Sequence, residues 1–367
     1  MTRDLGNVRV SPETAMRCAS VRACVALIAE SVAGLPLILY ARGLDGSKTR
    51  ASDHPLYVVL HDQASDLESS FEWRRGMMAD LLLYGRAFSF VNRLRGMVYE
   101  LIRLPAQSVT VERDADGTPR YRVTDSNGAQ RVYDRTEVFA IEALGGIAPV
   151  ASASEAIRLA LLLETHGARL FGAGARPGGV LETDKMLTPQ VIERLKASFE
   201  NGFAGAANAG KTAILEDGLK FKPLTLNSVD SQYLELRKFQ VEEIARAFRV
   251  PLHKIGQLDR ATFSNIEHQA LEFVTDCLMP WIKLLEGAIR RSLLTQEERG
   301  EYFAEFLVDD LLRGDIKSRY EAYSQGILNG ILSPNEVRSR ENLPPYDGGD
   351  EHRLPLNTAP AGSTPTA

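Results

Sequence analysis

The chain has 367 residues, of which 44% are hydrophobic and 25% are charged. These values are ordinary for a globular protein with a sizeable core. The formal net charge of -5 argues against a protein that grips nucleic acid broadly, because such proteins usually carry a basic patch or stripe. The three cysteines, Cys18, Cys24 and Cys277, lie in apolar helical patterns, so we expect them to be reduced core residues.

Membrane and export signals are absent from the sequence pattern. Residues 1–12 are polar and lack the apolar core of a signal peptide. The longest apolar runs fall well short of the roughly 20 residues that a membrane helix needs. We therefore expect a soluble, intracellular protein that makes no membrane contact.

The first 150 residues alternate short helical and strand patterns. Ser11 is a candidate N-cap for a helix that Pro12 opens and Gly34 ends. The other expected elements are a strand at 36–40, a polar turn at 43–52, helices at 56–60 and 70–84, and strands at 87–91, 98–102 and within 108–138. Asp116-Gly117 and Asn127-Gly128 are the strongest hairpin signals in the chain. This pattern predicts an α+β domain with a meandering sheet and no nucleotide-binding βαβ unit.

The next region places a compact α/β unit after a long helix. Ser152 and Glu155 form a capping-box pattern, which predicts the start of a helix that runs to about Phe171. After a glycine-rich break, the expected elements are a strand at 180–182, a helix at 188–203, and strands at 212–215 and 220–224. Long helices precede and follow this βαββ insertion, so we expect it at the far end of a helical pair.

Two long helices then flank a short loop. The first spans about 230–249 and ends at Pro251, which cannot continue a helix. Its apolar residues at near-helical spacing are Tyr233, Leu236, Ile244, Ala247 and Phe248. The second helix begins near Ser264, carries an apolar stripe on one face and should kink at Pro280. The loop between them has a polar tip, made of Gln257, Asp259, Arg260 and Thr262.

The C-terminal part contains a strand and two further helices. Tyr302 to Val308 alternates as a strand, and residues 315–328 have helical spacing. Ser333 and Glu336 form a second capping-box pattern, which predicts a short helix. Residues 354–367 are rich in proline, threonine and alanine, and we expect them to be disordered.

The segment from Gly205 to Thr212 fits the phosphate-binding pattern G-x-x-x-x-G-K-[ST], with Gly210 and Lys211 near its end. Such a site needs a loop that leaves a strand and enters a helix, so that backbone N–H groups face the phosphates. Here the order is reversed, because a helix is expected before the loop and a strand after it. We interpret the segment as a connecting loop and expect no cofactor.

Other patterns for catalysis or metal binding are weak. His54 and His61 stand close in sequence, with Asp53 and Asp62 beside them. This arrangement would suit a metal site, but scattered polar helix and turn positions explain it equally well. No serine lies in a G-x-S-x-G pattern, and no Cys/His pair stands out. We predict a non-enzymatic protein without catalytic residues or a bound metal.

The charges on the 230–249 helix allow two interpretations. Glu242 and Arg246 have the favourable i,i+4 order, and Glu235 and Lys238 are three residues apart. An ordinary solvated face would show this pattern. A helix packed beside copies of itself would show it too, with the charges paired between subunits of a ring that one repeated contact closes.

A series of short motifs runs through the chain in a fixed order: Val10-Ser-Pro-Glu13, Gly178-Gly-Val-Leu181, Phe248-Arg-Val-Pro251, Ile255-Gly256, Thr262-Phe-Ser-Asn265, Leu278-Met-Pro280, Gly330-Ile-Leu-Ser-Pro-Asn-Glu-Val-Arg338 and Gly348-Gly-Asp350. This series resembles the portal proteins of tailed double-stranded DNA phages, specifically the lambdoid class. The resemblance extends from about Val10 to Pro355. It fits a phage, a prophage or a gene transfer agent equally well.

The resemblance implies an α+β portal fold with a wing, long stem helices, a small βαββ clip, a tunnel loop and a short helical crown. The implied division is wing 1–150, stem helix 151–172, clip 173–227, stem helix 228–250, tunnel loop 251–265, long kinked helix and returning wing strand 266–313, crown 314–350 and disordered tail 351–367. On this mapping the tunnel-loop tip named above faces DNA, and Glu235, Lys238, Glu242 and Arg246 lie between subunits. Gly205, Gly210 and Lys211 belong to the adaptor-facing clip.

The resemblance also implies partners. A portal of this class is a homo-oligomeric, twelve-fold ring at one capsid vertex of the virion, assembled in the host bacterial cytoplasm. Its implied partners are the major capsid protein, the terminase, the head-tail adaptor and double-stranded DNA, which passes through the channel without sequence specificity during packaging and ejection. Two alternatives stay open: a P-loop ATPase of a packaging motor, and a monomeric α+β interaction module.

Overall fold

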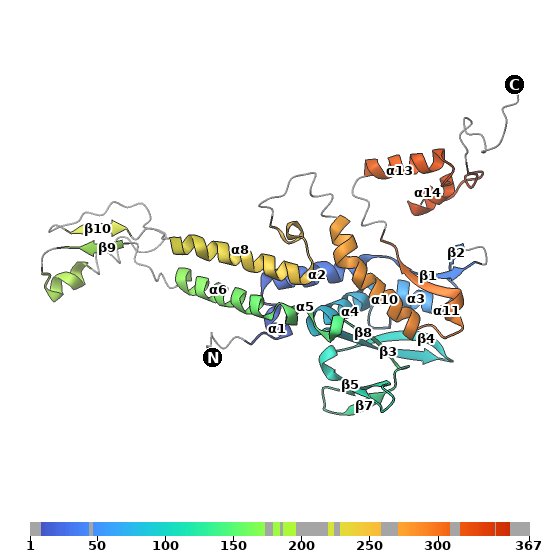
Figure 1. The fold of residues 1–367 in the computed structure, drawn as a ribbon, viewed down its shortest axis with the longest axis horizontal. Helices are drawn as coiled ribbons and strands as arrows, with labels where there is room; N and C mark the ends of the chain where they lie inside the picture. The colour runs from blue at the N-terminus through green and yellow to red at the C-terminus, as the bar shows by residue number, and fades with distance from the viewer. Residues whose placement is uncertain are drawn as a thin grey trace, which may run out of the picture. The chain divides into compact units, whose positions relative to one another are not determined.

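The structure is a computed structural model (Figure 1). It describes residues 9–43, 47–172, 179–183, 186–195, 219–223, 228–257, 271–308, 316–341 and 343–352. The chain divides into two compact units. Unit 1 comprises Met1–Cys18 and Ser154–Ile244, and unit 2 comprises Ala19–Ala153 and Ala245–Ala367.

Helices and strands alternate along the described part of the chain. The helices are α1 (Pro12–Ala15), α2 (Ala19–Gly34), α3 (Pro55–His61), α4 (Ser70–Tyr84), α5 (Pro149–Ser152), α6 (Ser154–Gly172), α8 (Ser228–Phe248), α10 (Met279–Ser292), α11 (Glu298–Glu301), α13 (Ile316–Leu328) and α14 (Pro334–Arg340). The strands are β1 (Leu37–Arg42), β2 (Lys48–Arg50), β3 (Arg86–Leu94), β4 (Met97–Leu104), β5 (Val109–Arg113), β6 (Pro119–Thr124), β7 (Gln130–Tyr133), β8 (Val138–Glu142), β9 (Gly179–Glu182), β10 (Lys220–Pro223) and β11 (Tyr302–Phe306). This mixture confirms the α+β class.

Unit 2 contains three antiparallel sheets, ordered β4-β3-β8, β11-β1-β2 and β5-β6-β7. Two of them join strands far apart in sequence. In one, β11 pairs with β1 so that Leu37 lies opposite Phe306, and in the other, β8 pairs with β3. The third sheet is the predicted meander, and its turns place Gly117 and Gly128 at φ of 83° and 82°. Glycine adopts this left-handed region without steric cost, which explains the hairpin signals.

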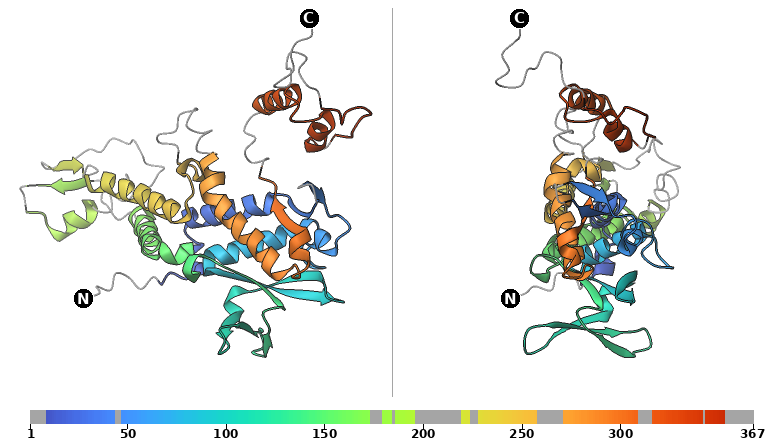
Figure 2. Two further views of the ribbon diagram at one scale, coloured as in Figure 1. Left: turned by 45° about the vertical axis from the view of Figure 1, so that its right-hand side comes forward. Right: turned by 90° about the vertical axis from the view of Figure 1, so that its right-hand side faces the viewer.

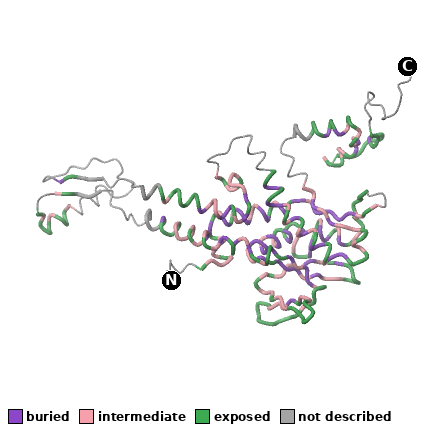
Figure 3. The backbone as a smooth tube through the Cα atoms, in the orientation of Figure 1, coloured by how far each residue is buried: buried purple, intermediate pink, exposed green. Residues whose placement is uncertain are grey.

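The core of unit 2 lies around α4, which packs against both α2 and β3. Trp73 is fully buried, donates its indole N–H to the Ser89 hydroxyl over 3.1 Å, and has its ring centroid 5.6 Å from that of Phe139. Figure 3 shows buried residues concentrated along these elements. The burial of α2 and α4 explains why apolar residues surround so much of each helix.

The boundaries of α4 follow from local signals. Ser69 and Glu72 form a capping box at its start. Gly85 ends the helix at φ 77°, and a Cβ there would overlap the carbonyl oxygen of Gly146. Glycine is therefore required by both the backbone angle and the close approach. The structure confirms the predicted helix 70–84.

Arg74 is a buried arginine that joins three segments. Its guanidinium donates to the carbonyl of Ala33 over 2.8 Å, the carbonyl of Leu60 over 2.7 Å and the hydroxyl of Ser70 over 2.7 Å. Burial lowers its pKa to about 10, so the side chain stays charged at neutral pH. It thereby supplies hydrogen-bond donors to carbonyls in the last turns of α2 and α3, which have no N–H partner within their own helices.

Three local predictions were wrong in detail. The helix expected from Pro12 to Gly34 is broken after Ala15, where Cys18 N–H donates to the Ala15 carbonyl. Ser152 does not cap the following long helix, because it is itself the last residue of α5 and its hydroxyl donates to the Ala148 carbonyl. The polar segment 43–52 contains the strand β2. Its backbone pairs with β1, and this pairing stabilises a strand whose polar residues do not predict one.

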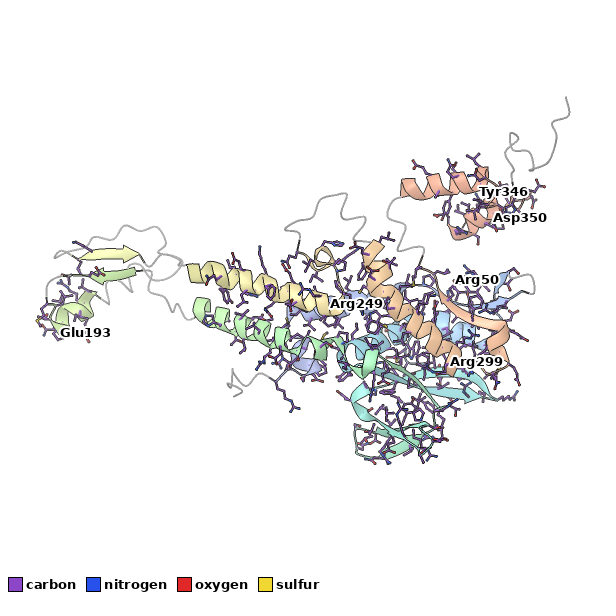
Figure 4. All side chains as sticks on the ribbon, in the orientation of Figure 1. Arg50, Glu193, Arg249, Arg299, Tyr346 and Asp350 are labelled. Atoms are coloured by element: carbon purple, nitrogen blue, oxygen red, sulfur yellow. The ribbon has the colours of Figure 1, made fainter. Side chains whose placement is uncertain are left out.

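Unit 1 contains the long helix α6 and most of the long helix α8, which lie side by side in the views of Figures 1 and 2. The two-stranded antiparallel sheet of β9 and β10 belongs to the segment that connects them, with Glu182 opposite Lys220. Residues 189–195 of the predicted helix 188–203 are helical, and they include the exposed Glu193 (Figure 4). The rest of the predicted βαββ insertion, including strand 212–215, lies outside the described residues.

The helices α13 and α14 form a small hairpin. Ser333 and Glu336 make the predicted capping box at the start of α14. The Tyr323 hydroxyl lies 3.1 Å from a carboxylate oxygen of Glu341 and joins the two helices. The amide of Asn335 bonds the backbone N–H and carbonyl of Tyr346, each over 3.0 Å, and so holds the segment that follows (Figure 4).

Candidate functional site

The side chain of Tyr233 joins the helices α6 and α8. The Tyr233 hydroxyl donates to the Leu163 carbonyl over 2.7 Å, and the ring lies 6.0 Å from that of His166. A Cβ at Gly167 would overlap the Tyr233 hydroxyl. Glycine at this position therefore allows the tyrosine of α8 to reach the backbone of α6.

The opposite face of α8 carries the predicted inter-subunit residues. Glu235, Lys238, Glu242 and Arg246 recur at steps of three and four and share one face, whereas Tyr233 points to the other side. Three of the four are exposed and Glu242 is half-buried. Their positions on the helix are therefore compatible with contact to another molecule, and their role stays a prediction.

Exposed apolar side chains accompany these charges, which the sequence pattern did not reveal. Leu234 is 60% exposed and Phe239 is 50% exposed, and Leu236, expected among the inward residues, is 38% exposed. Phe239 lies on the charged face, next to Glu235 and Glu242 by helical spacing. Large apolar side chains gathered on a helix surface indicate a contact face. In the sequence, the available signal was that these apolar residues alternate with charged ones.

The end of α8 has a Schellman geometry. Arg249 adopts a left-handed conformation at φ 57° and its N–H donates to the Arg246 carbonyl, while Val250 N–H donates to the Ala245 carbonyl over 2.9 Å. The helix therefore ends at Phe248, three residues before Pro251, as that proline predicts. Arg249 is marked in Figure 4.

Residues at the start of the predicted tunnel loop and just before it contact residues that follow the loop. The Cys277 thiol donates to the Phe248 carbonyl over 3.5 Å, and the Lys254 ammonium lies 5.7 Å from the centroid of the Phe273 ring. Burial raises the pKa of Cys277 to about 12, so the thiol stays protonated. Phe273 and Cys277 belong to a π-helix, Phe273–Leu278, that precedes α10. The segments that precede residue 258 and follow residue 270 therefore pack against each other.

The predicted DNA-facing residues are only partly described. Gln257 is half-buried at the base of the loop, and its N–H donates to the Leu252 carbonyl over 3.1 Å. Asp259, Arg260 and Thr262 lie outside the described residues, as does Ser264, the expected start of the next helix. Pro280 stands in the first turn of α10, directly after the π-helix, which accounts for the predicted irregularity at this position.

The clip residues Gly205, Gly210 and Lys211 also lie outside the described residues. The histidines weighed as metal ligands have other roles: His54 accepts the N–H of Leu56 at the start of α3, and His61 lies 2.7 Å from Asp62. Within the described ranges there is no group of three or more acidic, histidine or cysteine residues placed to hold a metal. None of the helices described here is long and apolar enough to cross a membrane.

Comparison with known proteins identifies the class. The family model described as phage portal protein matches residues 19–342. The portal protein of Enterobacteria phage HK97 is 31% identical over 359 residues, which cover 94% of this chain and 83% of that protein. The probable portal protein of Streptomyces phage phiC31 is 30% identical over 375 residues, covering 97% of this chain and 81% of that protein.

Solved structures agree in fold. A chain from the neck of an empty gene transfer agent particle aligns with a TM-score of 0.68 at 24% identity, covering 94% of this chain and 96% of that chain. An HK97-family phage portal protein from Corynebacterium diphtheriae aligns with a TM-score of 0.54 at 21% identity, covering 84% and 99%. The chain belongs to the phage portal protein family, as the order of its sequence motifs predicted.

Proposed function

We propose that the chain assembles into a twelve-subunit ring at one capsid vertex. The ring is the channel through which DNA is packaged and ejected, and the docking site for terminase and the head-tail adaptor. The family match supports the class of protein, and the similar chains come from particle necks computed with C6 or C12 symmetry, which supports a ring. The role is structural and non-enzymatic.

Within this ring we assign each segment of the chain a role. The wing comprises 1–150 and the returning strand within 266–313, the stem comprises 151–172 and 228–250, the clip is 173–227, the tunnel loop is 251–265, and the crown is 314–350, followed by the tail 351–367. The paired helices α6 and α8 and the two-stranded sheet of β9 and β10 support the order stem, clip, stem. The paired base at Phe248 and Cys277 supports a projecting loop between them.

The observation that carries this proposal is the outer face of α8. In a single subunit, Leu234 and Phe239 are exposed to water among charged residues, which is unfavourable for apolar side chains. Burial against a neighbouring subunit would remove this free-energy cost. Glu235, Lys238, Glu242 and Arg246 on the same helix then pair with charges of the next subunit. A heterologous contact of this kind, repeated with a constant rotation, closes into a ring.

The first experiment measures assembly. Twelve copies of a 40.5-kDa chain form a particle of about half a megadalton, which mass photometry and end-on negative-stain images detect. We expect Leu234→Asp with Phe239→Asp to shift the mass toward the monomer. The control Leu67→Asp, at a side chain in unit 2 that is 84% exposed, should leave the ring intact. Solitary wild-type particles without a central opening would overturn the proposal.

A second experiment addresses the tunnel loop. Deleting residues 257–262 removes the polar tip and leaves the base contact between Lys254 and Phe273 in place. We expect rings of normal mass that package DNA poorly. Normal packaging by rings that carry the deletion would contradict the loop's assignment.

The two alternatives are separated by simple assays. ATP hydrolysis that the substitution Lys211→Ala abolishes would favour a packaging-motor ATPase. A wild-type protein that sediments as a monomer at all concentrations would favour an interaction module. The family match favours neither alternative.

A further inference from the structure

Unit 2 contains a basic pocket that the ring proposal does not use. Its volume is about 470 Å³, within the range typical of ligand sites. Four arginines from separate segments line it: Arg93 of β3, Arg135 before β8, Arg291 of α10 and Arg299 of α11. None of its lining residues is acidic. This local excess of positive charge contrasts with the chain's net charge of -5.

Three of the arginines are held in place by backbone carbonyls. Arg93 donates to the Ser292 carbonyl over 2.9 Å, Arg299 donates to the Arg291 carbonyl over 2.7 Å, and Arg291 donates to the Ala140 carbonyl over 3.3 Å. The first two contacts stabilise the C-terminal end of α10, where cations are favoured, and the third joins α10 to β8. Carbonyl acceptors orient a guanidinium but leave its full charge uncompensated (Figure 4 labels Arg299).

Glu298, a carboxylate that interacts electrostatically with Arg93, is already engaged. Glu298 accepts the N–H of Thr295 over 2.7 Å, and its other oxygen lies 3.4 Å from the His54 ring. These contacts lower the pKa of Glu298 against the opposing effect of burial. Burial lowers the pKa of Arg93, which Glu298 only partly offsets. A bound anion would relieve this incompletely compensated charge.

The fold does not require an arginine at position 135. Its side chain is exposed at the rim of the pocket. Unlike the other three arginines, it makes no hydrogen bond or ion pair within the described part of the chain. Holding one more arginine beside three others costs electrostatic repulsion. Such a placement favours binding of an anion by several guanidinium groups.

The rest of the lining indicates which anion. Val138, Leu294 and Pro119 supply apolar surface, and Tyr121 and Thr295 supply hydroxyl groups. Burial raises the pKa of Tyr121, so its hydroxyl stays protonated at neutral pH. A DNA duplex presents its phosphates along a rod and needs an open surface, whereas a pocket with apolar walls fits a side chain or a chain end. We propose that this pocket binds an acidic peptide segment of a partner protein, with carboxylates on the arginines and an adjacent apolar side chain against Val138 and Leu294.

The test uses the full-length protein and a fluorescein-labelled hexapeptide of alternating leucine and glutamate. We expect saturable binding that weakens with added salt, and no binding of the same peptide with glutamine in place of glutamate. Arg135→Gln should weaken binding roughly tenfold, because one charged hydrogen-bonding partner is lost, and Arg135→Lys should restore part of the affinity. Since Arg135 supports no other residue, its variants should fold normally, which thermal unfolding checks.

The matched control is Arg131→Gln, which removes the same charge from an exposed position on β7 outside the pocket. It should leave peptide affinity unchanged. Equal losses from Arg131→Gln and Arg135→Gln, or no peptide binding at all, would overturn the proposal. Binding of a short DNA duplex or of inorganic phosphate that depends on Arg135, with no binding of the peptide, would also overturn it and assign the pocket to phosphate groups. Each outcome is independent of ring assembly, which mass photometry reports separately.

Discussion

The helices α4 and α8 have opposite surroundings. In α4, both apolar and polar residues are buried, among them Trp73, Arg74 and Asp80. In α8, all residues from Leu234 to Phe239 are exposed. The comparison shows that α4 is specified by the core of its own chain, whereas the exposed part of α8 needs another molecule to bury its apolar side chains.

The largest effect is expected in α4. Trp73→Ala removes a fully buried indole and its bond to Ser89, so the free energy of unfolding should fall by about 3–5 kcal/mol. Phe71→Ala, at a position that is 39% exposed on the same helix, should cost much less. Chemical denaturation followed by tryptophan-independent far-UV circular dichroism compares the two variants. Equal costs would contradict the description of α4 as a core helix.

A smaller effect is expected between α6 and α8. Tyr233→Phe removes the hydroxyl that donates to the Leu163 carbonyl, which should cost roughly 0.5–1.5 kcal/mol. Hydrogen exchange of the α6 amides measures this loss locally. Tyr99→Phe, at a side chain that is 57% exposed, is the control and should leave exchange unchanged. Unchanged protection of α6 in the Tyr233 variant would show that this bond does not hold the pair.

A stabilising change is expected at the end of α8. Arg249 is a non-glycine residue at φ 57°, so Arg249→Gly should relieve about 0.5–1 kcal/mol of backbone strain, offset in part by the greater flexibility of the unfolded chain. Thermal unfolding should show a small rise in Tm. The same substitution at Arg246, which is within the helix, should instead lower Tm by removing a good helix former. A fall in Tm for Arg249→Gly would mean that its side chain contributes more than the strain costs.

The smallest effect on stability is expected on the exposed face of α8. Phe239→Gln should change the unfolding free energy of a dissociated subunit by no more than about 0.5 kcal/mol, because the side chain is 50% exposed. The same variant should weaken assembly of the ring. Measurements at low and high protein concentration separate the two effects. A large loss of subunit stability would place Phe239 in the subunit's own core and remove the contrast with α4.

Much of the fold was predictable because its signals act over a few residues. The capping box at Ser69 and the glycine at Gly85 define α4, and the capping box at Ser333 defines the start of α14. The glycines at 117 and 128 define two hairpin turns by their left-handed backbone. The order of the motifs was sufficient to predict the family that the comparisons then showed.

The sequence alone therefore determined most of the helices, the two glycine hairpin turns and the family, because caps, glycines and periodicity are local properties of the chain. Only the tertiary structure decided that β11 pairs with β1, that Leu236 is exposed, and that Arg93, Arg135, Arg291 and Arg299 line one pocket. These features bring together residues up to hundreds of positions apart. No local pattern encodes such contacts, because they depend on how the elements pack against each other.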